Sequence, residues 1–360
     1  MKKLVVLVSL VLGFMLTDCV SAEEGAMNFY VKPLPSTKQN SENNKVGYYD
    51  LILNKGEKDS LKIEVSNQSN KALEIDMSVN TAKTNSNGLV DYGKNKLLTS
   101  KNLKYKTEDY VKGPKSIELK AKESKVIKLE INSPDEDVPG IMAGGITFKE
   151  NEETNKENKE NESAKDRQGV AIENQYAYVI GILLRQSQKK VSPNLDVLDV
   201  TADLFNGHVA IITNIENNQA AFVNTMRVDA KVKKRAREEV IYSKTVENMQ
   251  MAPNSLLRFP LELEEKNIKS GKYTLDMTIF SFLDDKGKYK DEEGRLYRYK
   301  WEFSKDFEVT KDDAYQLNKD NVDNTGTSWW IYGVLAGVLL LLLILFSIWK
   351  KMKKEDEKAE

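Results

Sequence analysis

The chain has 360 residues, a formal net charge of −1 and 30% charged residues. Because neither sign of charge dominates, the composition gives no reason to expect nucleic acid or another strongly charged polymer as a partner. The chain contains one cysteine and one histidine, which excludes disulfide frameworks and zinc sites rich in histidine or cysteine. We expect no cofactor and no metal site.

The N-terminus has the organisation of a secretory signal peptide. Two lysines precede an apolar stretch over residues 4–16, and small residues follow at positions 20–22. This order is typical of a signal peptide, and the apolar part is too short to span a bilayer. We therefore expect residues 1–22 to be removed by cleavage between Ala22 and Glu23. A lipoprotein alternative would use Cys19, but the bulky aspartate directly before it disfavours that modification.

A second apolar segment lies near the C-terminus. Residues 329–349 carry no charge and are bounded by tryptophans. Their length suits the hydrocarbon core, tryptophans suit the interfaces, and the lysines that follow indicate a cytoplasmic end. The sequence thus predicts a single-pass cell-membrane protein with an extracellular N-terminal ectodomain and a cytoplasmic tail at 350–360. The residues expected to form this anchor are Trp329, Trp330, Trp349, Lys350, Lys351, Lys353 and Lys354.

Covalent attachment to a Gram-positive wall by sortase is an alternative use of the same end of the chain. Residues 322–326 faintly resemble the LPxTG substrate, but Asp323 stands where proline belongs. The lysine-rich tail fits better with a segment that stays in place. The polar residues 313–328 are then expected to form a short stalk.

Residues 27–188 show the pattern of a first β-sandwich. Apolar and polar side chains alternate in residues 61–65, 73–79 and 127–131. A period of two is typical of strands with one face in a core and one in water. Turn formers such as 85–88 separate these strands, as an antiparallel sandwich requires. We expect an all-β fold with two immunoglobulin-like β-sandwich domains in tandem, plus one C-terminal transmembrane helix.

A charged run at residues 149–167 interrupts the first sandwich. It consists mostly of Lys, Glu and Asn and cannot bury a core, so we expect it to be solvated. The apolar segments on either side, 141–148 and 176–184, favour a hairpin with this run as its long loop. An interdomain linker is the alternative. With the hairpin, the domain boundary falls near residues 191–193.

The second β-sandwich is predicted over residues 189–312. The Asn-Gly pair at 206–207 predicts a tight hairpin turn. Apolar residues alternate with polar ones over 226–232 and 273–279, which again predicts half-buried strands.

The two predicted sandwiches share a short internal similarity. The segment 65–70, VSNQSN, is echoed by 212–217, ITNIEN. In this comparison Asn67 corresponds to Asn214. The similarity suggests two copies of a related sandwich.

Residues able to carry catalysis are few. The one histidine, His208, directly follows the predicted turn and has no nucleophile motif beside it, so we expect a surface histidine. A glycosidase-type carboxylate pair stays possible, but Asp and Glu lie mostly on polar strand faces and in charged runs. The acidic segments 284–287 and 291–294 lack the spacing of an EF-hand and are expected to be turns, with a loose calcium site as the alternative. We therefore expect a binding protein and no enzyme.

Aromatic and methionine side chains do not define a site. Trp301 and Phe303 are expected to fill a core. Met249 and Met251 lie on a strand face or, alternatively, line an adaptable partner surface. Exposed sheet edges offer another route, in which a partner adds a strand. The ligand-binding residues stay unknown.

Several segments, taken in order, resemble the WxL-interacting proteins of Gram-positive bacteria. They are NFYVKPLP (28–35), GYYDL (47–51), IEVSN (63–67), NGLVDY (87–92), QYAYVIG (175–181), MQMAPNS (249–255), GKYT (271–274), and WEF (301–303) running to FEV (307–309). The resemblance spans nearly the whole predicted ectodomain, and its order is more specific than any one motif.

This resemblance implies a two-domain surface binding protein. The family's first domain, here with motif core 28–150, is associated with peptidoglycan, and the second with host ligands. The family's boundary for the second domain lies near residue 168, earlier than the hairpin argument places it. The family is also associated with noncovalent binding of secreted WxL proteins. This chain contains no Trp-x-Leu, so the resemblance makes it the receptor.

Three functions compete. The leading hypothesis is a membrane-anchored surface protein that noncovalently holds WxL-domain proteins and peptidoglycan. The second is an adhesin for host matrix proteins. The third is a wall-modifying hydrolase that uses a carboxylate pair.

Overall fold

The computed structural model describes residues 27–43, 47–151, 176–263 and 267–323, together with short helical pieces between 333 and 347. Strands dominate the described chain, as the alternating patterns predict. The strands are β1 (Phe29–Pro33), β2 (Tyr49–Ile52), β3 (Lys58–Asn67), β4 (Leu73–Thr81), β5 (Lys83–Thr84), β6 (Val90–Asp91), β7 (Val111–Lys112), β8 (Ser116–Leu119), β9 (Ser124–Asn132), β10 (Met142–Glu150), β11 (Ala177–Arg185), β12 (Leu195–Phe205), β13 (His208–Asn217), β14 (Val223–Lys234), β15 (Val240–Met251), β16 (Ser255–Glu262), β17 (Gly271–Leu283), β18 (Tyr289–Lys290) and β19 (Leu296–Val309). The helical elements named here are η1 (Ser41–Asn43), α2 (Thr107–Tyr110) and α4 (Lys311–Asp320).

The strands from β1 to β11 form the first β unit. One large sheet has the order β1-β3-β9-β7 and the other β2-β11-β10-β4-β8, while β5 and β6 pair in a separate two-stranded sheet. Apolar side chains of both sheets meet in one core that includes Leu61, Ile63, Ile75, Leu129 and Phe148. Because successive side chains of a strand point to opposite faces, the alternation seen in the sequence places these residues together inside. The mostly-β, immunoglobulin-like fold is thus confirmed.

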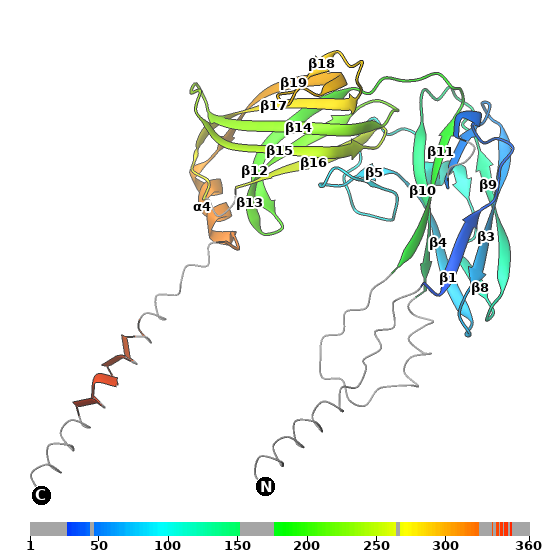
Figure 1. Cartoon of the computed structure of the whole chain (residues 1–360), viewed down its shortest axis with the longest axis horizontal. Coiled ribbons are helices and arrows are strands. Elements are labelled where there is room, and N and C mark those ends of the chain that lie inside the picture. The colour runs from blue at the N-terminus through cyan, green and yellow to red at the C-terminus, as the bar shows by residue number, and fades with distance from the viewer. Residues whose placement is uncertain are drawn as a thin grey trace, which may run out of the picture.

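The strands from β12 to β19 form the second β unit. Its sheets have the orders β12-β13-β16 and β15-β14-β17-β19-β18. A separate core contains Val228, Val232, Phe259, Leu275 and Ile279. The strands of the two units run in clearly different directions (Figure 1). Each unit therefore carries its own pair of sheets and its own buried core.

The predicted hairpin around the charged run is confirmed. β10 pairs antiparallel with β11, from Met142 opposite Leu184 to Lys149 opposite Ala177. β11 also pairs with β2 in parallel, so it belongs to the first unit. Most of the charged run itself lies outside the described residues. The predicted turn at 206–207 is confirmed as well, because Phe205 pairs with His208 across it.

Equivalent turns in the two units are held by two asparagines. The Nδ2 group of Asn67 donates to the carbonyl oxygens of Lys71 and Lys120, at 2.7 and 2.9 Å. The Nδ2 group of Asn217 donates in the same way to Ala221 and Ala252, at 2.7 and 2.8 Å. In each unit the first acceptor lies four residues beyond the asparagine. The structural equivalent of Asn67 is therefore Asn217, three residues beyond the position that the sequence echo suggests.

Residues 313–323, predicted as the start of a stalk, instead lie against the second unit. A capping box at Thr310 begins α4, which satisfies orphan N–H groups of its first turn. Ala314 is buried in the second core. The Asn318 side chain exchanges two hydrogen bonds with the backbone of Ile268, both of 2.8 Å. The polar composition of this segment thus reflects an amphipathic helix with one packed side.

The predicted membrane localisation needs correction. A bilayer span requires about 20 consecutive apolar helical residues. Within the ranges that the structure describes, no helix combines the necessary length and apolarity. The single-pass localisation, with its extracellular ectodomain and cytoplasmic tail, is therefore wrong on this finding. Ala22, Glu23, Trp329, Trp330, Trp349 and the four lysines of the tail lie outside the described residues.

Candidate functional site

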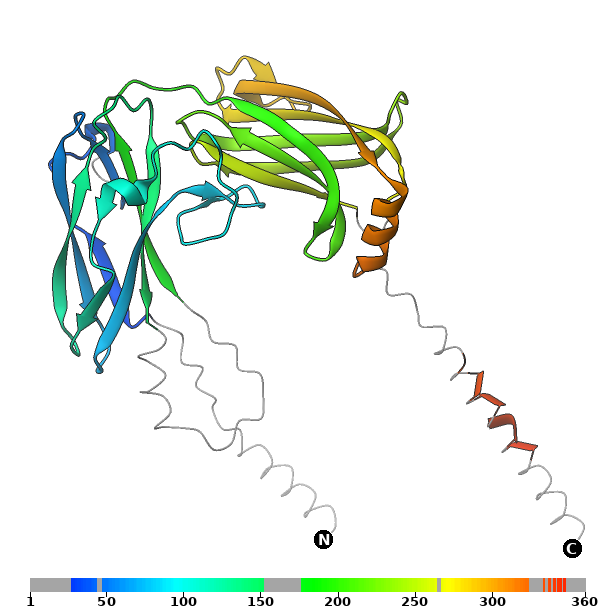
Figure 2. The ribbon, with the colours of Figure 1, turned by 180° about the vertical axis from the view of Figure 1, so that it is seen from behind.

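The two β units meet at a junction formed by three segments of the first unit and two turns of the second. The segment that carries β5 and β6 reaches from the first unit towards the second (Figure 2). Its Thr84 hydroxyl accepts a 3.0 Å hydrogen bond from the Ala252 N–H and lies 2.6 Å from the Ser255 hydroxyl oxygen. At its tip, the Gly88 carbonyl accepts from the Gln250 N–H at 2.6 Å. The segment is thus bonded to the second unit at β5 and at its turn.

Two further contacts widen the junction. The Ser100 hydroxyl donates to the Glu216 carboxylate at 2.5 Å, and both residues are buried. The Ile141 N–H donates to the Ala220 carbonyl at 2.8 Å. Gly140, with φ of +71°, approaches the same carbonyl so closely that a Cβ would lie 2.2 Å from its oxygen. Only glycine fits this conformation and this approach.

A small apolar cluster closes the junction. Ala82, Ala143 and Ala252 are buried in it, and Tyr92 and Phe222 are among the partly buried side chains that pack around them. Burial raises the pKa of the Tyr92 hydroxyl, as expected for a phenol removed from water. Alanines at the centre allow the backbones of the two units to approach closely.

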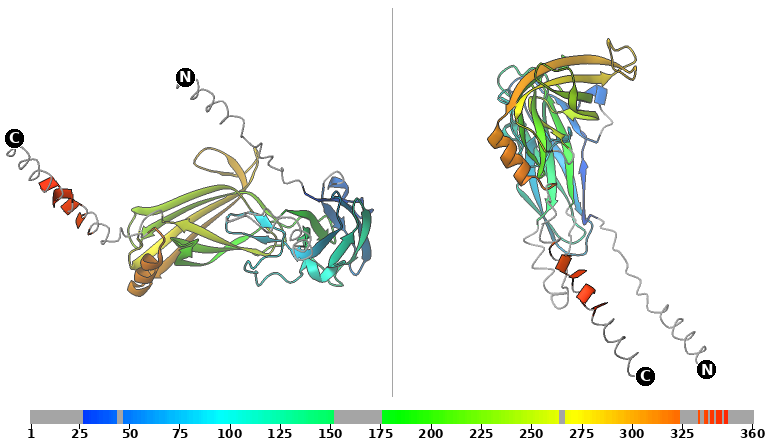
Figure 3. Two further views of the ribbon diagram at one scale, coloured as in Figure 1. Left: turned by 90° about the horizontal axis from the view of Figure 1, so that it is seen from below. Right: turned by 90° about the vertical axis from the view of Figure 1, so that its left-hand side faces the viewer.

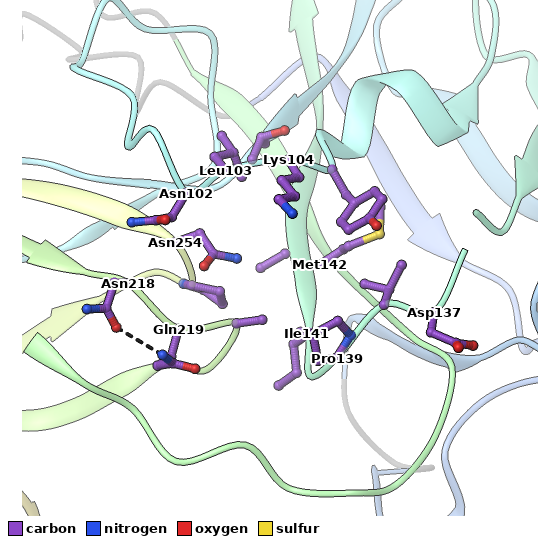
Figure 4. Close-up of a pocket in the computed structure, with 16 residues that line it drawn as sticks. Asn102, Leu103, Lys104, Asp137, Pro139, Ile141, Met142, Asn218, Gln219 and Asn254 are labelled. Atoms are coloured by element: carbon purple, nitrogen blue, oxygen red, sulfur yellow. Dashed lines mark hydrogen bonds between the residues drawn. The ribbon is translucent and has the colours of Figure 1, made fainter. Parts of the chain in front are cut away.

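A cavity of about 280 Å³ lies at the edge of this junction. The first unit contributes Lys104, Tyr105 and Met142, and the second contributes Gln219 and Asn254. Figure 4 shows the carboxamides on one side and the Lys104 side chain and Met142 on the other. The cavity lining combines amide donors and acceptors, one ammonium group, the Asp137 carboxylate and apolar side chains, which suits a small polar ligand.

The cavity walls are partly preorganised. Gln219 donates to Asn218 at 3.0 Å within the wall, as the dashed line in Figure 4 shows. The Tyr105 hydroxyl donates to Glu136 at 2.9 Å, and this hydrogen bond together with burial raises the pKa of Tyr105. Such fixed side chains lose little conformational freedom when a ligand enters.

A second hollow, of about 880 Å³, lies on the first unit between β4, β10 and the α2–β8 segment. Its lining includes the cations Lys94, Lys112, Lys115 and Lys149. Of its two carboxylates, Glu108 accepts from the Thr81 hydroxyl and Asp76 accepts from Asn151. The hydroxyl of Thr147, which also lines the hollow, has no hydrogen-bond partner among the described residues. We call this site the first-unit hollow; its excess of positive charge suits an anionic ligand.

The sequence-predicted candidates have ordinary structural places. His208 is partly exposed, and its Nδ1 lies 2.7 Å from an Asp323 carboxylate oxygen, as expected for a surface histidine. The hydrogen bond to Asp323 raises the pKa of His208. Met249 and Met251 are buried strand residues. Met249 also contacts Gly88. The methionine considered for a partner surface therefore packs against a turn of the chain's own first unit.

The expected core role of Trp301 and Phe303 is only partly met, because both are half-buried against the second core. The two acidic segments are turns, and one aspartate in each faces an arginine. Asp291 accepts from Arg295 Nε at 2.7 Å and lies 3.6 Å from Arg227 Nη1. Arg298 Nε donates to Asp284 at 2.5 Å. Among the described residues, no cluster of histidines, cysteines or carboxylates has the arrangement of a metal site.

The junction escaped sequence reasoning because its contacts join residues far apart in the chain. Gly88 was visible only as a turn residue, and nothing in its sequence neighbourhood points to Gln250. The one local signal is the run MQMAPNS at 249–255, which carries three of the groups that bond to the first unit.

Two family models match the chain. The model described as the WxL Interacting Protein, peptidoglycan binding domain, matches residues 29–150. The model described as the WxL Interacting Protein, host binding domain, matches residues 167–319. The second match includes β11, which pairs within the first unit, so family boundary and sheet membership differ at this strand. No curated protein matches the chain.

Similar solved structures are distant. The crystal structure of the class 5 fimbriae chaperone CfaA shares 13% identity, covering 77% of this chain and 99% of its own, with a TM-score of 0.29. The E. coli chaperone DraB shares 12% identity, covering 78% and 96%, with a TM-score of 0.27. A chaperone–tip adhesion subunit complex, CsuC-CsuE of Acinetobacter baumannii, shares 10%, covering 58% and 85%, with a TM-score of 0.27. At these values the structural similarities carry no functional argument. The two family models, which match consecutive parts of the chain, show that it belongs to the WxL Interacting Protein family.

Proposed function

We propose that the protein is a noncovalent adaptor of the Gram-positive cell surface that holds peptidoglycan and WxL-domain proteins together. The family assignment makes it a cell-surface binding protein with a peptidoglycan-binding and a host-binding domain. The observation that carries the proposal is the order of these two matches along one chain. WxL-domain proteins are proposed as partners because the family is described as WxL-interacting. Because the chain itself has no Trp-x-Leu, we assign it the receptor role.

The first-unit hollow is our candidate for the peptidoglycan contact. It lies within the strands of the matched peptidoglycan-binding region. Peptidoglycan carries carboxylates on its stem peptides, and lysines bind carboxylates through charge-assisted hydrogen bonds. Lys112 and Lys115 are exposed at this hollow, so they are placed to make such contacts.

The domain organisation is also our inference. We assign one sandwich to residues 27–188 and a second to 189–312, because each unit has its own core and repeats the same asparagine-held turn. The hairpin between β10 and β11 supports a boundary after β11. The packed junction supports a fixed relation between the two sandwiches, which would present two ligands at a defined spacing.

A host-matrix adhesin is the second candidate function. It is favoured by the host-binding match at residues 167–319. The hydrolase alternative has less support, because both matched models are binding domains. In addition, the carboxylates of Asp284 and Asp291, one in each acidic turn, are engaged by arginines.

The proposal is tested by a pull-down of the full-length protein with purified cell wall and with a WxL-domain protein. We expect retention of both. Charge reversal at Lys112→Glu with Lys115→Glu should lower retention on cell wall, whereas Lys128→Glu, on the exposed side of β9, should not. Failure of the wild-type protein to retain either ligand would count against the adaptor role.

A further inference from the structure

A hollow of about 640 Å³ lies at one end of the second unit, beside β18. The connection that carries β18 projects from this end of the unit (Figure 3). The hollow is bounded by that connection, by β19 and by the segment that leads into β12. We call it the β18 hollow.

Its aromatic lining comes from the inner face of a sheet. Trp301 pairs with Ile279, a core residue, and Tyr299 pairs with the buried Ser281. Residues directly opposite in an antiparallel pair share a face, so both aromatic side chains lie on the core side of β19. They are nevertheless only half-buried, and both line the hollow.

The two rings are held in a fixed arrangement. The Tyr299 and Trp301 rings stack with centroids 5.8 Å apart and an interplanar angle of 13°. Phe282 meets the Tyr299 ring edge-on at 5.5 Å. The polar tips are tied to the segment before β12, since Tyr299 donates to Ser192 and Trp301 to Asn194, both at 3.4 Å. A rigid aromatic pair of this kind offers a flat apolar platform without an entropic cost of ordering.

Positive charge lies beside the platform. The hollow is lined by four cations, Lys286, Lys288, Arg298 and Lys300, against a single carboxylate, that of Asp284. Lys300 pairs across the sheet with Phe280 and its Nζ lies 5.7 Å from the centre of that ring, so its ammonium group is on the face of β19 opposite the platform. The carboxylate is already used by the protein, because it accepts from Arg298 and from the Lys286 N–H. Lys300 pairs with Glu302 at 2.8 Å. Lys286 and Lys288 make no ion pair with any residue of the described ranges, so their ammonium groups remain available.

The turn that presents these lysines is fixed by its backbone. The Gly287 N–H donates to the Asp284 carbonyl at 2.7 Å, and the Asp284 N–H donates to Leu296 at 2.9 Å. A Cβ at Gly287 would lie 2.5 Å from backbone atoms of Tyr297, so only glycine allows the turn to pack this closely. The cations are therefore carried at a set position beside the rings.

We infer that the β18 hollow binds an anionic polysaccharide, with a sugar ring packed on the Tyr299–Trp301 platform and its carboxylate or sulfate groups at Lys286 and Lys288. The inference rests on the proposed function in taking the second unit as a ligand-binding region of a surface protein. Stacked aromatic side chains accept the apolar C–H face of a sugar, and adjacent ammonium groups select for negative charge. The same chemistry occurs in sulfated or carboxylated host glycans and in peptidoglycan strands.

The test is binding of the full-length protein to heparin, hyaluronan and soluble peptidoglycan fragments, measured by calorimetry or biolayer interferometry at two salt concentrations. The variants are Lys286→Glu with Lys288→Glu, and Tyr299→Ala. The matched controls are Lys305→Glu, on β19 outside the hollow, and the exposed Tyr315→Ala of α4. Thermal unfolding of each variant checks that the fold is retained, and Tyr299→Phe keeps the ring if the alanine variant fails to fold.

We expect at least one of the three polysaccharides to bind. Either hollow variant, or added salt, should lower the affinity about tenfold or more, whereas neither control should lower it. Binding of heparin or hyaluronan identifies a host glycan, and binding of the peptidoglycan fragments identifies the wall. The inference is overturned if none of the three binds, if the controls weaken binding as much as the hollow variants, or if oligo(dT) binds equally well.

The pull-down on insoluble cell wall separates this inference from the proposed function. The Lys286→Glu, Lys288→Glu protein keeps the first-unit hollow intact, so its retention on cell wall should persist while soluble glycan binding is lost. If the wild-type protein binds glycan but is not retained by cell wall or a WxL-domain protein, the adaptor proposal fails and the β18 hollow stands.

Discussion

Thr84 closes a ring of three hydrogen bonds at the junction. The Ser255 hydroxyl donates its one proton to the Ala252 carbonyl, at 2.7 Å. Its oxygen is then the acceptor for the Thr84 hydroxyl, at 2.6 Å. The Thr84 oxygen in turn accepts from the Ala252 N–H at 3.0 Å. All three residues are at most 3% exposed, so no water is placed to replace a lost partner.

The variant Thr84→Val keeps the shape of this side chain and removes its hydroxyl. The Ala252 N–H then loses its acceptor, while Ser255 keeps its bond to the carbonyl. Leaving one buried N–H unsatisfied costs about 1–3 kcal/mol. This cost falls on the closed junction, because in the open junction water can bond to the group. The opening equilibrium should therefore rise by roughly 5- to 150-fold.

Hydrogen exchange at the Ala252 amide measures this opening directly. We expect its protection to fall by that factor in Thr84→Val, with a smaller loss at neighbouring junction amides. Thr201→Val, on an exposed position of β12, is the matched control and should leave the protection unchanged. Unchanged exchange at Ala252 in the Thr84 variant, or an equal loss in the control, would refute the described ring.

Three further predictions concern other contacts. Gly88→Ala should open the junction at its tip, since φ of +69° and a Cβ 2.3 Å from a methionine methyl leave no room; exchange at the Gln250 amide measures it. His208 should titrate above its ordinary pKa of 6.5 because of Asp323, so its contribution to stability is present below 6.5 and lost as pH rises through the folded pKa; NMR of Asp323→Asn should show the pKa falling. Arg227→Met should destabilise the second unit by about 1–3 kcal/mol near neutral pH, because Asp229 loses a charge-assisted hydrogen bond and the buried Asp291 is left with Arg295 alone. Urea unfolding measures this.

Each of these three predictions has a control or an outcome that would contradict it. Gly181→Ala should be tolerated, because a Cβ there would meet only an ordinary contact at 3.5 Å. The chain has a single histidine, so the His208 resonances need no assignment and an unshifted pKa in the Asp323 variant would contradict the pairing. Burial by itself raises the pKa of Asp291, but Arg295 and Arg227 outweigh it and leave the pKa lowered. The Arg227→Met penalty should therefore shrink as pH falls towards the ordinary carboxyl pKa, and a penalty independent of pH would argue against the charge effect.

The strands could be predicted because burial on one face leaves a local signature. In residues 61–65, 226–232 and 273–279 every apolar position expected inside is buried, as a period of two requires. The β10–β11 hairpin was also predictable, because two apolar segments flank a run that cannot enter a core. In both cases the deciding information lies within the segment itself.

The packing of residues 313–323 could not be predicted in the same way. The segment is polar overall, and only Ala314 and Leu317 face the second core. A helix needs few apolar residues when a capping box starts it and an asparagine ties it to a neighbouring loop. Composition averages over the exposed and the packed side of such a helix, so it indicates a stalk.

The short sequence similarity between the two units does not align the structurally equivalent residues. Asn67 and Asn214 share their neighbours in sequence, yet Asn214 lies within β13 and its side chain donates to Asp199. Asn217 is at the end of its strand, as Asn67 is at the end of β3, and only there does a side-chain amide reach two turn carbonyls. The position of the asparagine that holds the turn is therefore set by the end of the strand, where backbone carbonyls lack a partner within the sheet. Because Asn217 Nδ2 also bonds to the Ala252 carbonyl, the second unit's copy of this turn holds in place the residue that the junction uses.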